Sequence, residues 1–489
     1  MRRAFVSLLA VALCVVTAGC GSSSSKTTVS SPLVTELSYF PTGSPFVAAI
    51  ATNTKGTAIQ NAEGLLGAFP LAKLGIGALE SKLESVGLDY QTDIEPLYGN
   101  PIMVGATEVP GSTSLTGAKF LGVWIVENAA KLRALLKKLP GFHASGHYDG
   151  ATLYQSGASA TFALDGATAV FGASAAGVDA ALNRHAHGGG ITSADFSRAM
   201  GNLPQDTLIQ AFGSLTTALS STGTANARKI PWVAAIRGYA ASISASSGGI
   251  TAQFRLDTSG GSLSAAELPI AAGTTAPDLA GTLPIAVGLR DPAQSLRFIE
   301  AAEQAIDPTS YAQFNSRENV AKSKTGYDLN TFAALLTSDL IIQSDTRTTM
   351  GRAEVSDSVS AAKQLAKLPQ VVRDIFHSAH GLTSLPGGFY AINERNGKPL
   401  DLGLLGNEFV AGLATPAQLR AFATAPTTSA PNAQGAVAFR ISLIDLLKIV
   451  VTTPPSAIVQ SFLSSLGDVT GSASASPSAL TGTLSLGVK

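Results

Sequence analysis

The sequence predicts an α+β fold built from two homologous repeats, each a mainly antiparallel sheet packed with helices. Turn signals between short apolar runs recur along the chain and outnumber the strand–helix alternations that are typical of parallel sheets. A second observation, an ordered series of internal matches, predicts the repeat. A doubly wound parallel sheet is the alternative.

Composition and charge exclude two classes of protein. The chain has 489 residues, of which 45% are hydrophobic and 13% charged, and its formal net charge is zero. A protein that binds nucleic acid by bulk electrostatics needs clustered basic charge, so no nucleic-acid partner is expected. The large apolar fraction excludes a disordered chain. At about 150 residues per domain, the length predicts two or three domains.

Residues 1–19 are typical of an export signal peptide. The start is basic, with two arginines, and the apolar segment 4–16 is short for a membrane span. Residues 17–20, Thr-Ala-Gly-Cys, resemble the lipobox of bacterial lipoproteins, although Thr17 stands where that pattern prefers leucine. The resemblance implies that Cys20 is lipidated and becomes the first mature residue. An ordinary signal peptide with a chance cysteine is the alternative.

Cysteine usage agrees with a lipid anchor. Of the two cysteines, Cys14 lies within the signal peptide, so Cys20 is the sole thiol of the mature chain and an intrachain disulfide is excluded. Residues 20–34 carry the lipidated cysteine and are expected to form a flexible tether, because serine and threonine dominate their composition. We expect an extracytoplasmic protein, anchored to the cell membrane by its N-terminal lipid.

The internal matches occur in the same order in both halves of the chain. Their offsets are 239 residues for Pro45 with Pro284, Asp89 with Asp328 and Ile102 with Ile341, 229 for Leu139 with Leu368, 240 for 166–172 with 406–412, and 230 for 242–251 with 472–481. Because the offset changes in loop-like stretches, we interpret 35–260 as repeat unit 1, 278–489 as repeat unit 2, and 261–277 as a linker.

Repeat unit 1 shows the expected elements in order. The helix predicted at 129–139 is amphipathic, with four leucines on one face, and the Pro-Gly pair at 140–141 ends it. The other predicted elements are a strand at 46–52, helices at 58–69 and 71–86, a hairpin of 101–107 with 120–126, strands at 151–155, 160–164 and 169–172, a helix at 175–184, a strand at 208–212, and a hairpin of 240–246 with 250–257.

Two stretches resemble a known family. At 37–48, Leu-Ser-Tyr-Phe-Pro-Thr-Gly-Ser-Pro-Phe-Val-Ala, small residues and prolines lead into an apolar strand soon after the export signal. At 87–99 the chain reads Gly-Leu-Asp-Tyr and then Asp-Ile-Glu-Pro-Leu-Tyr-Gly, and the plan recurs in the second half. In these features the chain resembles the DUF3352 group of bacterial envelope proteins. The resemblance covers nearly all of the mature chain through short motifs and implies location and architecture, not chemistry.

Four of the six histidines form pairs that could bind a metal. His185 and His187 precede three glycines and are expected on a solvated loop, where zinc would need at least a third ligand. His143 and His147 lie four residues apart in a predicted strand, so both should project from one face as a surface stripe. No metal site is predicted from either pair.

The sequence predicts no enzyme active site. The remaining pair, His377 and His380, lies one helical turn apart, as cationic residues near a helix C-terminus do. A nucleophile elbow, a phosphate loop and a dinucleotide motif are all absent, and no cofactor is expected. A Ser/His/Asp triad assembled in space is the alternative.

Acidic pairs and tryptophans have structural interpretations. Asp89 with Asp93, and Glu354 with Asp357, have spacings compatible with glycosidase carboxylates, but such acids are also common in turns and at helix N-termini. Asp89 and its counterpart Asp328 follow a glycine by two residues, which favours an N-cap. Both tryptophans, Trp124 and Trp232, are expected in the core.

Three functions are compatible with these observations. The first is a lipid-anchored binding or structural module of the cell envelope, whose partner is an envelope protein or an apolar ligand. The second is a carrier of a lipid or another apolar envelope molecule, because charge is low and a membrane is close. The third is an envelope hydrolase. A ligand site in the cleft between the two halves is expected by default.

Overall fold

The computed structural model describes most of the chain after the predicted tether. The described residues are 31–67, 81, 83–85, 87–108, 120–139, 142–156, 160–219, 225–259, 263–273, 275–281, 283–345, 347–376, 382–392, 399–429, 433–450, 460 and 463–489. Cys20, His377 and His380, and most of the helix predicted at 71–86, lie outside them.

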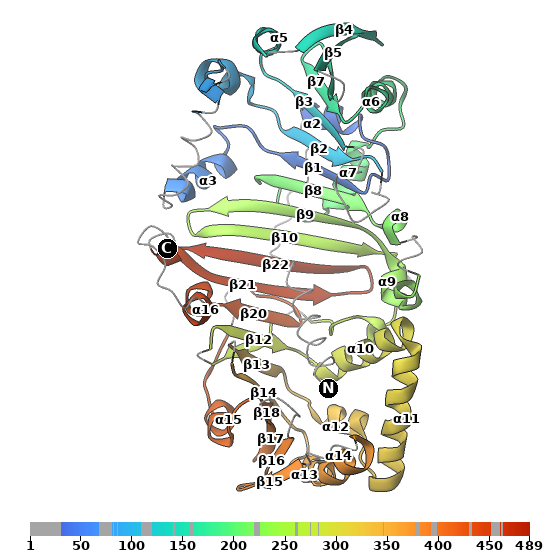
Figure 1. Cartoon of the computed structure of the whole chain (residues 1–489), viewed down its shortest axis with the longest axis vertical. Helices are drawn as coiled ribbons and strands as arrows, with labels where there is room; N and C mark the ends of the chain where they lie inside the picture. The colour runs from blue at the N-terminus through green and yellow to red at the C-terminus, as the bar shows by residue number, and fades with distance from the viewer. Residues whose placement is uncertain are drawn as a thin grey trace.

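One long sheet crosses the whole molecule, and its strands form a ladder along the longest axis (Figure 1). Each registered pair of neighbouring strands is antiparallel. The α+β prediction with a mainly antiparallel sheet is confirmed, and the doubly wound parallel alternative is wrong.

The ladder order follows from the registered pairs. From its outer edge to the centre, the first half runs β4 (Phe142–Tyr148), β5 (Ala151–Ser156), β6 (Ala160–Asp165), β7 (Thr168–Gly172), β3 (Phe120–Ile125), β2 (Ile102–Ala106), β1 (Phe46–Ile50), β8 (Ile209–Ser214), β9 (Ile236–Ser246) and β10 (Gly249–Thr258).

The second half continues from β10 without a break. From the centre outward it runs β22 (Ala479–Val488), β21 (Leu466–Ala475), β20 (Val437–Ile441), β12 (Ile285–Leu289), β13 (Leu340–Ser344), β14 (Thr349–Glu354), β18 (Glu408–Gly412), β17 (Leu400–Leu405), β16 (Phe389–Ile392) and β15 (Leu382–Leu385).

Helices and a small second sheet lie on or beside this ladder. Their bounds are α2 (Ser31–Leu37), α3 (Thr57–Gly67), α5 (Ala129–Lys138), α6 (Ala175–His187), α7 (Ser193–Met200), α8 (Thr216–Leu219), α9 (Pro231–Ala235), α10 (Pro292–Ile306), α11 (Pro308–Thr325), α12 (Leu329–Leu335), α13 (Ser358–Leu365), α14 (Leu368–Phe376), α15 (Pro416–Ala423) and α16 (Leu443–Val450), with the short strands β11 (Asp278–Ala280) and β19 (Thr427–Ser429).

In the first half, α2, α6 and α7 contact strands of one face of the sheet and bury the largest core cluster. Val47, Met103 and Phe212 project from the strands into this cluster, and Tyr39 and Phe40 enter it from the segment after α2. All five side chains are almost fully buried. We call this side of the sheet the covered face.

In the second half, the covered face is closed by different elements. The β11–β19 sheet contacts β12, β13 and β20, where Leu279 packs against Ala286 and Ala438. Farther out, α15 contacts β14, β17 and β18, and its Leu419 and Phe422 are buried. The apolar side chains of α15 therefore take the place that α6 has in the first half.

The amphipathic helix predicted at 129–139 is present as α5. Leu132, Leu135 and Leu136 are buried and form a core cluster with residues of β6 and β7. The side chain of Asn128 caps the helix by accepting a hydrogen bond from the backbone N–H of Lys131 at 3.0 Å. Periodicity and capping thus act together to place this helix.

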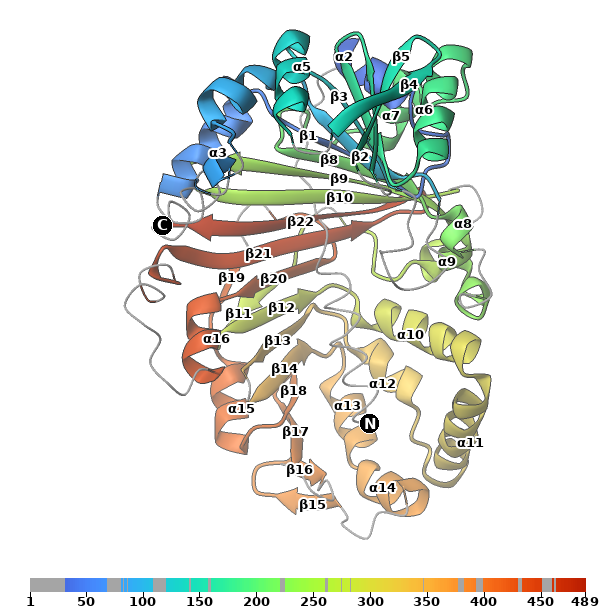
Figure 2. The ribbon, with the colours of Figure 1, turned by 45° about the horizontal axis from the view of Figure 1, so that its top comes forward.

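Strands of repeat unit 1 agree with their predicted ranges to within a few residues. The pair predicted at 101–107 and 120–126 is present as β2 and β3, and the final hairpin as β9 and β10. Helices α8, α9 and α10 lie at one end of the central strands, and α3 and α16 lie at the other end (Figure 2). Leu263, Leu268 and Ile270, from the segment predicted to be a linker, are buried in a cluster with Trp232.

Candidate functional site

The histidines of the first half do not form a metal site. The register of β4 against β5 shifts between Ala144 and Gly146, so His143 is opposite Gln155 and His147 is opposite Thr152. These partners are an odd number of residues apart, so the two histidines lie on opposite faces. The expectation that both project from one face is wrong, and the bulge is the reason.

The prediction of a solvated loop for His185 and His187 is also wrong, because both belong to the last turn of α6. The ring of His185 stacks on Tyr39, with ring centroids 4.3 Å apart. Its Nδ1 lies 2.6 Å from the hydroxyl oxygen of Ser38. His185 therefore fixes the chain that enters the core after α2. Within the described residues, no group of three potential ligands is arranged to hold a metal ion.

The acidic candidates have structural roles, as predicted. Asp89 accepts a hydrogen bond from the backbone N–H of Thr92 at 2.7 Å, and Asp328 accepts one from Thr331 at 3.1 Å. These bonds cap the turns that follow. The hydrogen bond from Thr92 lowers the pKa of Asp89, as expected for a carboxylate that acts as an N-cap.

The remaining acids are also accounted for. Asp93 pairs with Lys138, whose Nζ lies 2.6 Å from Oδ1. Asp357 caps α13 by accepting hydrogen bonds from the backbone N–H groups of Val359 and Ser360. These carboxylates therefore serve local structure.

The two tryptophans differ in their burial. Trp232 is buried and meets Phe298 edge-on, with ring centroids 6.4 Å apart. Trp124 lies in β3, as predicted, but is only half-buried, and its indole N–H donates to the carbonyl of Asn100 at 3.3 Å. Its side chain belongs to the side of the sheet opposite the covered face.

A row of apolar residues crosses eleven neighbouring strands on that opposite side, which we call the open face. Residues that are directly opposite in register share one face of a sheet. Following the registers from strand to strand gives the open row: Trp124, Ile102, Ile50, Ile209, Ile243, Ala252, Leu484, Gly471, Phe439, Val287 and Ile342.

The open row is apolar but incompletely buried. Only Gly471 and Phe439 are buried, and Ile50 has 37% of its surface exposed. The parallel row one residue along on the covered face is buried in all strands except β10 and β22: Ala49, Gln210, Ser242, Gln253, Thr483, Ser472, Ala438, Gly288 and Ile341. The helices and the small sheet therefore cover one face and leave the apolar residues of the other partly exposed.

Large exposed apolar side chains gather on the open face. Phe46 and Phe120 are both opposite Ala106 and have 36% and 46% of their surfaces exposed. Ile250, at the start of β10, has 38% exposed. Contiguous exposed apolar surface on a soluble protein usually marks a binding site.

The two central strands show the contrast between the faces most clearly. On the open face, β10 carries Ile250, Ala252, Phe254 and Leu256, and the other face carries Thr251, Gln253, Arg255 and Asp257. On β22 the same alternation sets leucines against threonine and serine. This period of two was visible in the sequence, but the sequence does not tell whether another layer covers the apolar side.

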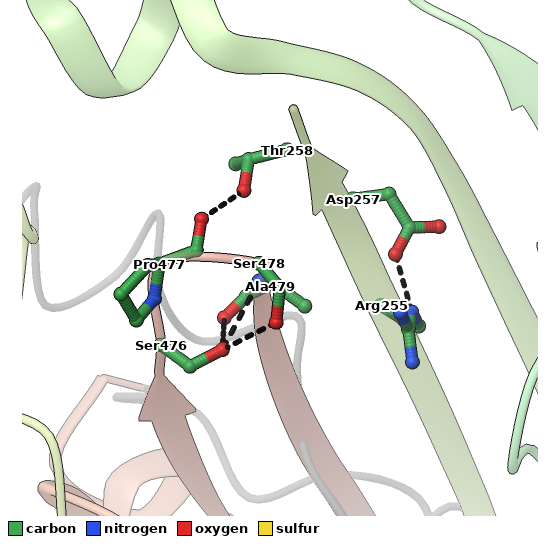
Figure 3. Close-up of polar contacts among 7 residues, drawn as sticks. All are labelled: Arg255, Asp257, Thr258, Ser476, Pro477, Ser478 and Ala479. Atoms are coloured by element: carbon green, nitrogen blue, oxygen red, sulfur yellow. Dashed lines mark hydrogen bonds and ion pairs between the residues drawn. The ribbon is translucent and has the colours of Figure 1, made fainter. Parts of the chain in front are cut away.

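A pocket of about 490 Å³ lies on the covered face at the far end of β10. Three arginines line it from three different elements: Arg198 from α7, Arg237 from the start of β9 and Arg255 from β10. Arg255 forms an ion pair with Asp257 (Figure 3). Sequence reasoning missed this site, because its arginines lie far apart along the chain.

The second half contributes the loop that borders this pocket. The hydroxyl of Thr258 donates to the carbonyl of Pro477 at 2.5 Å, and the hydroxyls of Ser476 and Ser478 lie 3.1 Å apart (Figure 3). Ser478 lines the pocket. The site therefore combines residues of both halves of the chain.

A third pocket, of about 350 Å³, is lined by charged groups of the second half. Glu354 and Glu408 are directly opposite each other on β14 and β18. Burial raises the pKa of Glu408, although the nearby Arg352 opposes the shift. Arg352 is itself buried and donates to the carbonyl of Phe422 at 2.6 Å. The residues that line this pocket include Ser338 and no histidine, so they do not form a Ser/His/Asp triad.

Comparisons with known proteins add no function. No protein-family model and no curated protein matches this sequence. Crystal forms III, IV and I of TP0453 are similar to part of the chain, each with a TM-score of 0.28 and with 8%, 7% and 9% identity. They cover 49%, 45% and 47% of this chain, and 84%, 80% and 80% of their own chains. At this score the similarity supports no inference about fold or function.

Proposed function

We propose that this protein is a lipid-anchored binding module of the bacterial cell envelope, which holds an apolar molecule against the open face of its sheet. The observation that carries the proposal is the open row, an unbroken line of apolar residues across eleven strands of which only two are buried. At the usual spacing between strands, this row is about 48 Å long.

The energetics favour an occupant for this face. Apolar surface left in water costs about 25 cal/mol for each Å² that could be buried. The side chains of the open row could have been polar, as they are on the other face of β10 and β22. Retaining isoleucine, phenylalanine and leucine there is best explained by a ligand that covers them.

The anchor is proposed from the sequence. In a lipoprotein, Cys20 would carry the lipid, and α2 begins eleven residues later at Ser31. A flexible segment of that length has a mean reach of about 18 Å, which would keep the sheet close to the bilayer. Within the described residues, no helix is long and apolar enough to cross a membrane.

The anchor has a direct test. We expect Cys20→Ala to move the mature protein from the membrane fraction to the soluble fraction of cells, measured by fractionation and immunoblotting. Retention of the variant in the membrane fraction would contradict a lipid anchor at Cys20.

We also propose that the two halves are homologous repeats. Counted from the centre, strands of the first half occur in the order 10, 9, 8, 1, 2, 3, 7, 6, 5, 4, and replacing each by its counterpart along the second half gives the order there. The caps agree, because Asp89 and Asp328 are 239 residues apart and Asn128 and Asp357 are 229 apart.

The registers refine the offsets on which the repeat rests. β2 begins at Ile102 and β13 at Leu340, which is an offset of 238, one less than the 239 that the sequence match assigns to Ile102. Gly166 and Gly406, 240 residues apart, have φ values of 58° and 62° in equivalent turns. These positive values favour glycine, which supports the match between the two hairpins.

A second candidate function is a carrier that removes a lipid or another apolar molecule from the membrane. The absence of charged residues from the open row favours it. A binding module and a carrier differ in whether the bound molecule leaves the membrane with the protein. The hydrolase alternative has less support, because the pocket that combines carboxylates and a serine includes no histidine among its lining residues.

Two matched variants on β22 test the open face. Leu484 projects from the open face and the adjacent Ser485 from the other, and both are half-buried. In the mature chain carrying Cys20→Ala, we expect Leu484→Gln to weaken binding of the uncharged dye Nile red about tenfold, because it removes one buried leucine contact. Fluorescence titration measures the affinity.

Ser485→Gln is the control, because it introduces the same side chain one residue away on the other face. It should bind the dye as the unaltered protein does. Native mass spectrometry of protein purified from membrane-containing cells then shows whether an apolar molecule co-purifies. Equal dye binding by Leu484→Gln and the unaltered protein would refute the proposed surface. A co-purifying lipid would favour the carrier, and its absence would favour a protein partner.

A further inference from the structure

We infer that the arginine-lined pocket at the end of β10 binds the oxyanion of a phosphate group. The pocket has a volume of about 490 Å³, which is within the range of small-ligand sites. Arg198, Arg237 and Arg255 converge on it from α7, β9 and β10. A guanidinium group is planar and presents paired N–H donors, which match the oxygens of a phosphate.

Two of the three arginines already have a carboxylate partner. Arg198 Nη1 lies 3.0 Å from Asp195, and Arg255 uses its Nε for Asp257. A guanidinium group has five N–H donors, so each of these ion pairs leaves other donors free to reach a ligand. Asp195 is further occupied, because it accepts hydrogen bonds from the backbone and the hydroxyl of Thr192 in the capping box of α7.

The third arginine gives the pocket an excess of positive charge. Arg237 Nη1 donates to the carbonyls of Ala234 and Ile236, at 2.8 and 3.1 Å. These neutral acceptors hold the guanidinium in place without cancelling its charge. Among the described residues that line the pocket there are three arginines and two aspartates, so one positive charge remains for a ligand.

The floor and rim of the pocket suit an anionic group attached to a less polar body. Ile191, Ala199 and Phe212 contribute apolar surface, while Ser214 and Ser478 contribute hydroxyls. The side chain of Arg198 is 75% exposed, so it is free to move toward a ligand. A phosphate ester fits this combination better than an uncharged ligand, because burial of the ester's organic part would accompany neutralisation of the phosphate.

This inference is independent of the open face. Phe212, Ala240 and Arg255 are opposite one another in register, and Val47, which belongs to the covered face, is opposite Phe212. The pocket therefore lies on the other side of the sheet from the open row. Two sources of the same chemistry are possible, namely free phosphate and the phosphate of a membrane lipid.

The test uses the mature chain carrying Cys20→Ala, so that its own lipid does not hold it on vesicles. Inorganic phosphate is titrated by calorimetry, and binding to vesicles of phosphatidylglycerol is measured by co-sedimentation, with phosphatidylcholine vesicles for comparison. We expect Arg237→Gln to weaken phosphate or phosphatidylglycerol binding tenfold or more, since a hydrogen bond between charged groups is lost.

The matched control is Arg133→Gln on α5. Arg133 is exposed and donates to the carbonyl of Gly166 at 3.1 Å, so this variant also removes one positive charge and one bond to a carbonyl. It should bind as the unaltered protein does. Saturable binding of phosphate alone assigns the site to a free phosphate ester, and binding of phosphatidylglycerol vesicles alone assigns it to a lipid headgroup.

Three results would overturn the inference. They are no binding of either probe, equal binding by Arg237→Gln and the unaltered protein, and an equal loss in Arg237→Gln and Arg133→Gln. A variant with Arg198→Gln, whose side chain is largely exposed, guards against misfolding of Arg237→Gln and should weaken binding in the same direction. Nile red binding should be unchanged in these variants, which separates this test from that of the open face.

Discussion

Glu36 is a buried carboxylate at the point where the chain enters the core. Its side chain is fully buried, and Oε1 accepts a hydrogen bond from the backbone N–H of Ile125 at 2.9 Å. Its Oε2 has no hydrogen-bond partner within the described residues. Burial raises the pKa of Glu36 to about 8, because the charged form loses its hydration. The folded protein therefore holds Glu36 protonated under conditions in which the unfolded chain ionises it.

The stability of the protein should consequently fall as the pH rises. Below the ordinary pKa of 4.5 both states are protonated and the contribution of Glu36 is complete. Between that value and about 8 the unfolded state releases the proton, and the free energy of unfolding decreases by at most about 1.4 kcal/mol per pH unit. We expect Glu36→Gln to remove this dependence, measured by urea unfolding from pH 5 to pH 8.

Glu303→Gln serves as the control for this prediction. Glu303 is exposed on α10, so its substitution removes a carboxylate without relieving burial. It should retain the pH dependence of the unaltered protein. A parallel loss of stability with pH in Glu36→Gln and the unaltered protein would show that Glu36 is not the group responsible.

His185 shows where residue-level prediction reaches its limit. Two histidines before three glycines are compatible with either a loop or the end of a helix, and the structure has the helix, which ends at Gly188 with φ of 89°. Glycine at that position was itself a signal for a helix end. The stacking partner of His185, Tyr39, is distant in sequence, so no local pattern could predict the contact.

Elements with a strong local signal were predicted well. The period of the leucines in α5 and the aspartates that precede α12 and α13 each specify a helix or its start through contacts within a few residues. The hairpin of β9 and β10 was predicted for the same reason, since its strands alternate and a tight turn joins them. Local physics is sufficient for such elements.

Elements whose position depends on distant partners were predicted less well. The bulge in β4 changes which way His147 projects, and nothing in the sequence of β4 alone indicates it. Helix α2 begins at Ser31, within the segment interpreted as a tether, because Leu33 and Leu37 find a place in the core. Its seven residues are too few to be helical without that packing.

The open face illustrates the same division at the level of layers. Alternation along β10 and β22 predicts that one side is apolar, yet burial of that side depends on whether a helix or a second sheet is available to cover it. The segment around Leu268 and Ile270 covers only the end near α9 and α10. The candidate sites therefore emerge from the arrangement of layers, which the sequence does not specify.

At the scale of the whole molecule, the two halves meet through one pair of strands. Nine residue pairs join β10 to β22. The sequence match between 242–251 and 472–481 has an offset of 230, and the register places Gln253 opposite Thr483, which are also 230 residues apart. The proposed repeat therefore predicts that these two positions are equivalent and lie beside a pseudo-twofold axis.

A disulfide across this axis tests the register that joins the halves. Opposite Cα atoms of antiparallel strands lie about 4.5–5.5 Å apart, within the range that a disulfide spans. The natural chain after Cys20 has no cysteine, so the Cys20→Ala chain with Gln253→Cys and Thr483→Cys has two thiols. We expect them to oxidise within one molecule and to raise the free energy of unfolding by about 2–4 kcal/mol.

The matched control moves one cysteine by a single residue, to Leu484. Because successive side chains of a strand project from opposite faces, Gln253→Cys with Leu484→Cys puts the two thiols on different sides of the sheet. That variant should keep both thiols free, as measured by thiol titration and mass spectrometry. Oxidation of the control but not of the opposed pair would place the register one residue away, and the equivalence of Gln253 and Thr483 would fail with it. Oxidation of the opposed pair alone requires both strands to be held as described, and it would tie the internal sequence match to a contact that joins residues 230 apart along the chain.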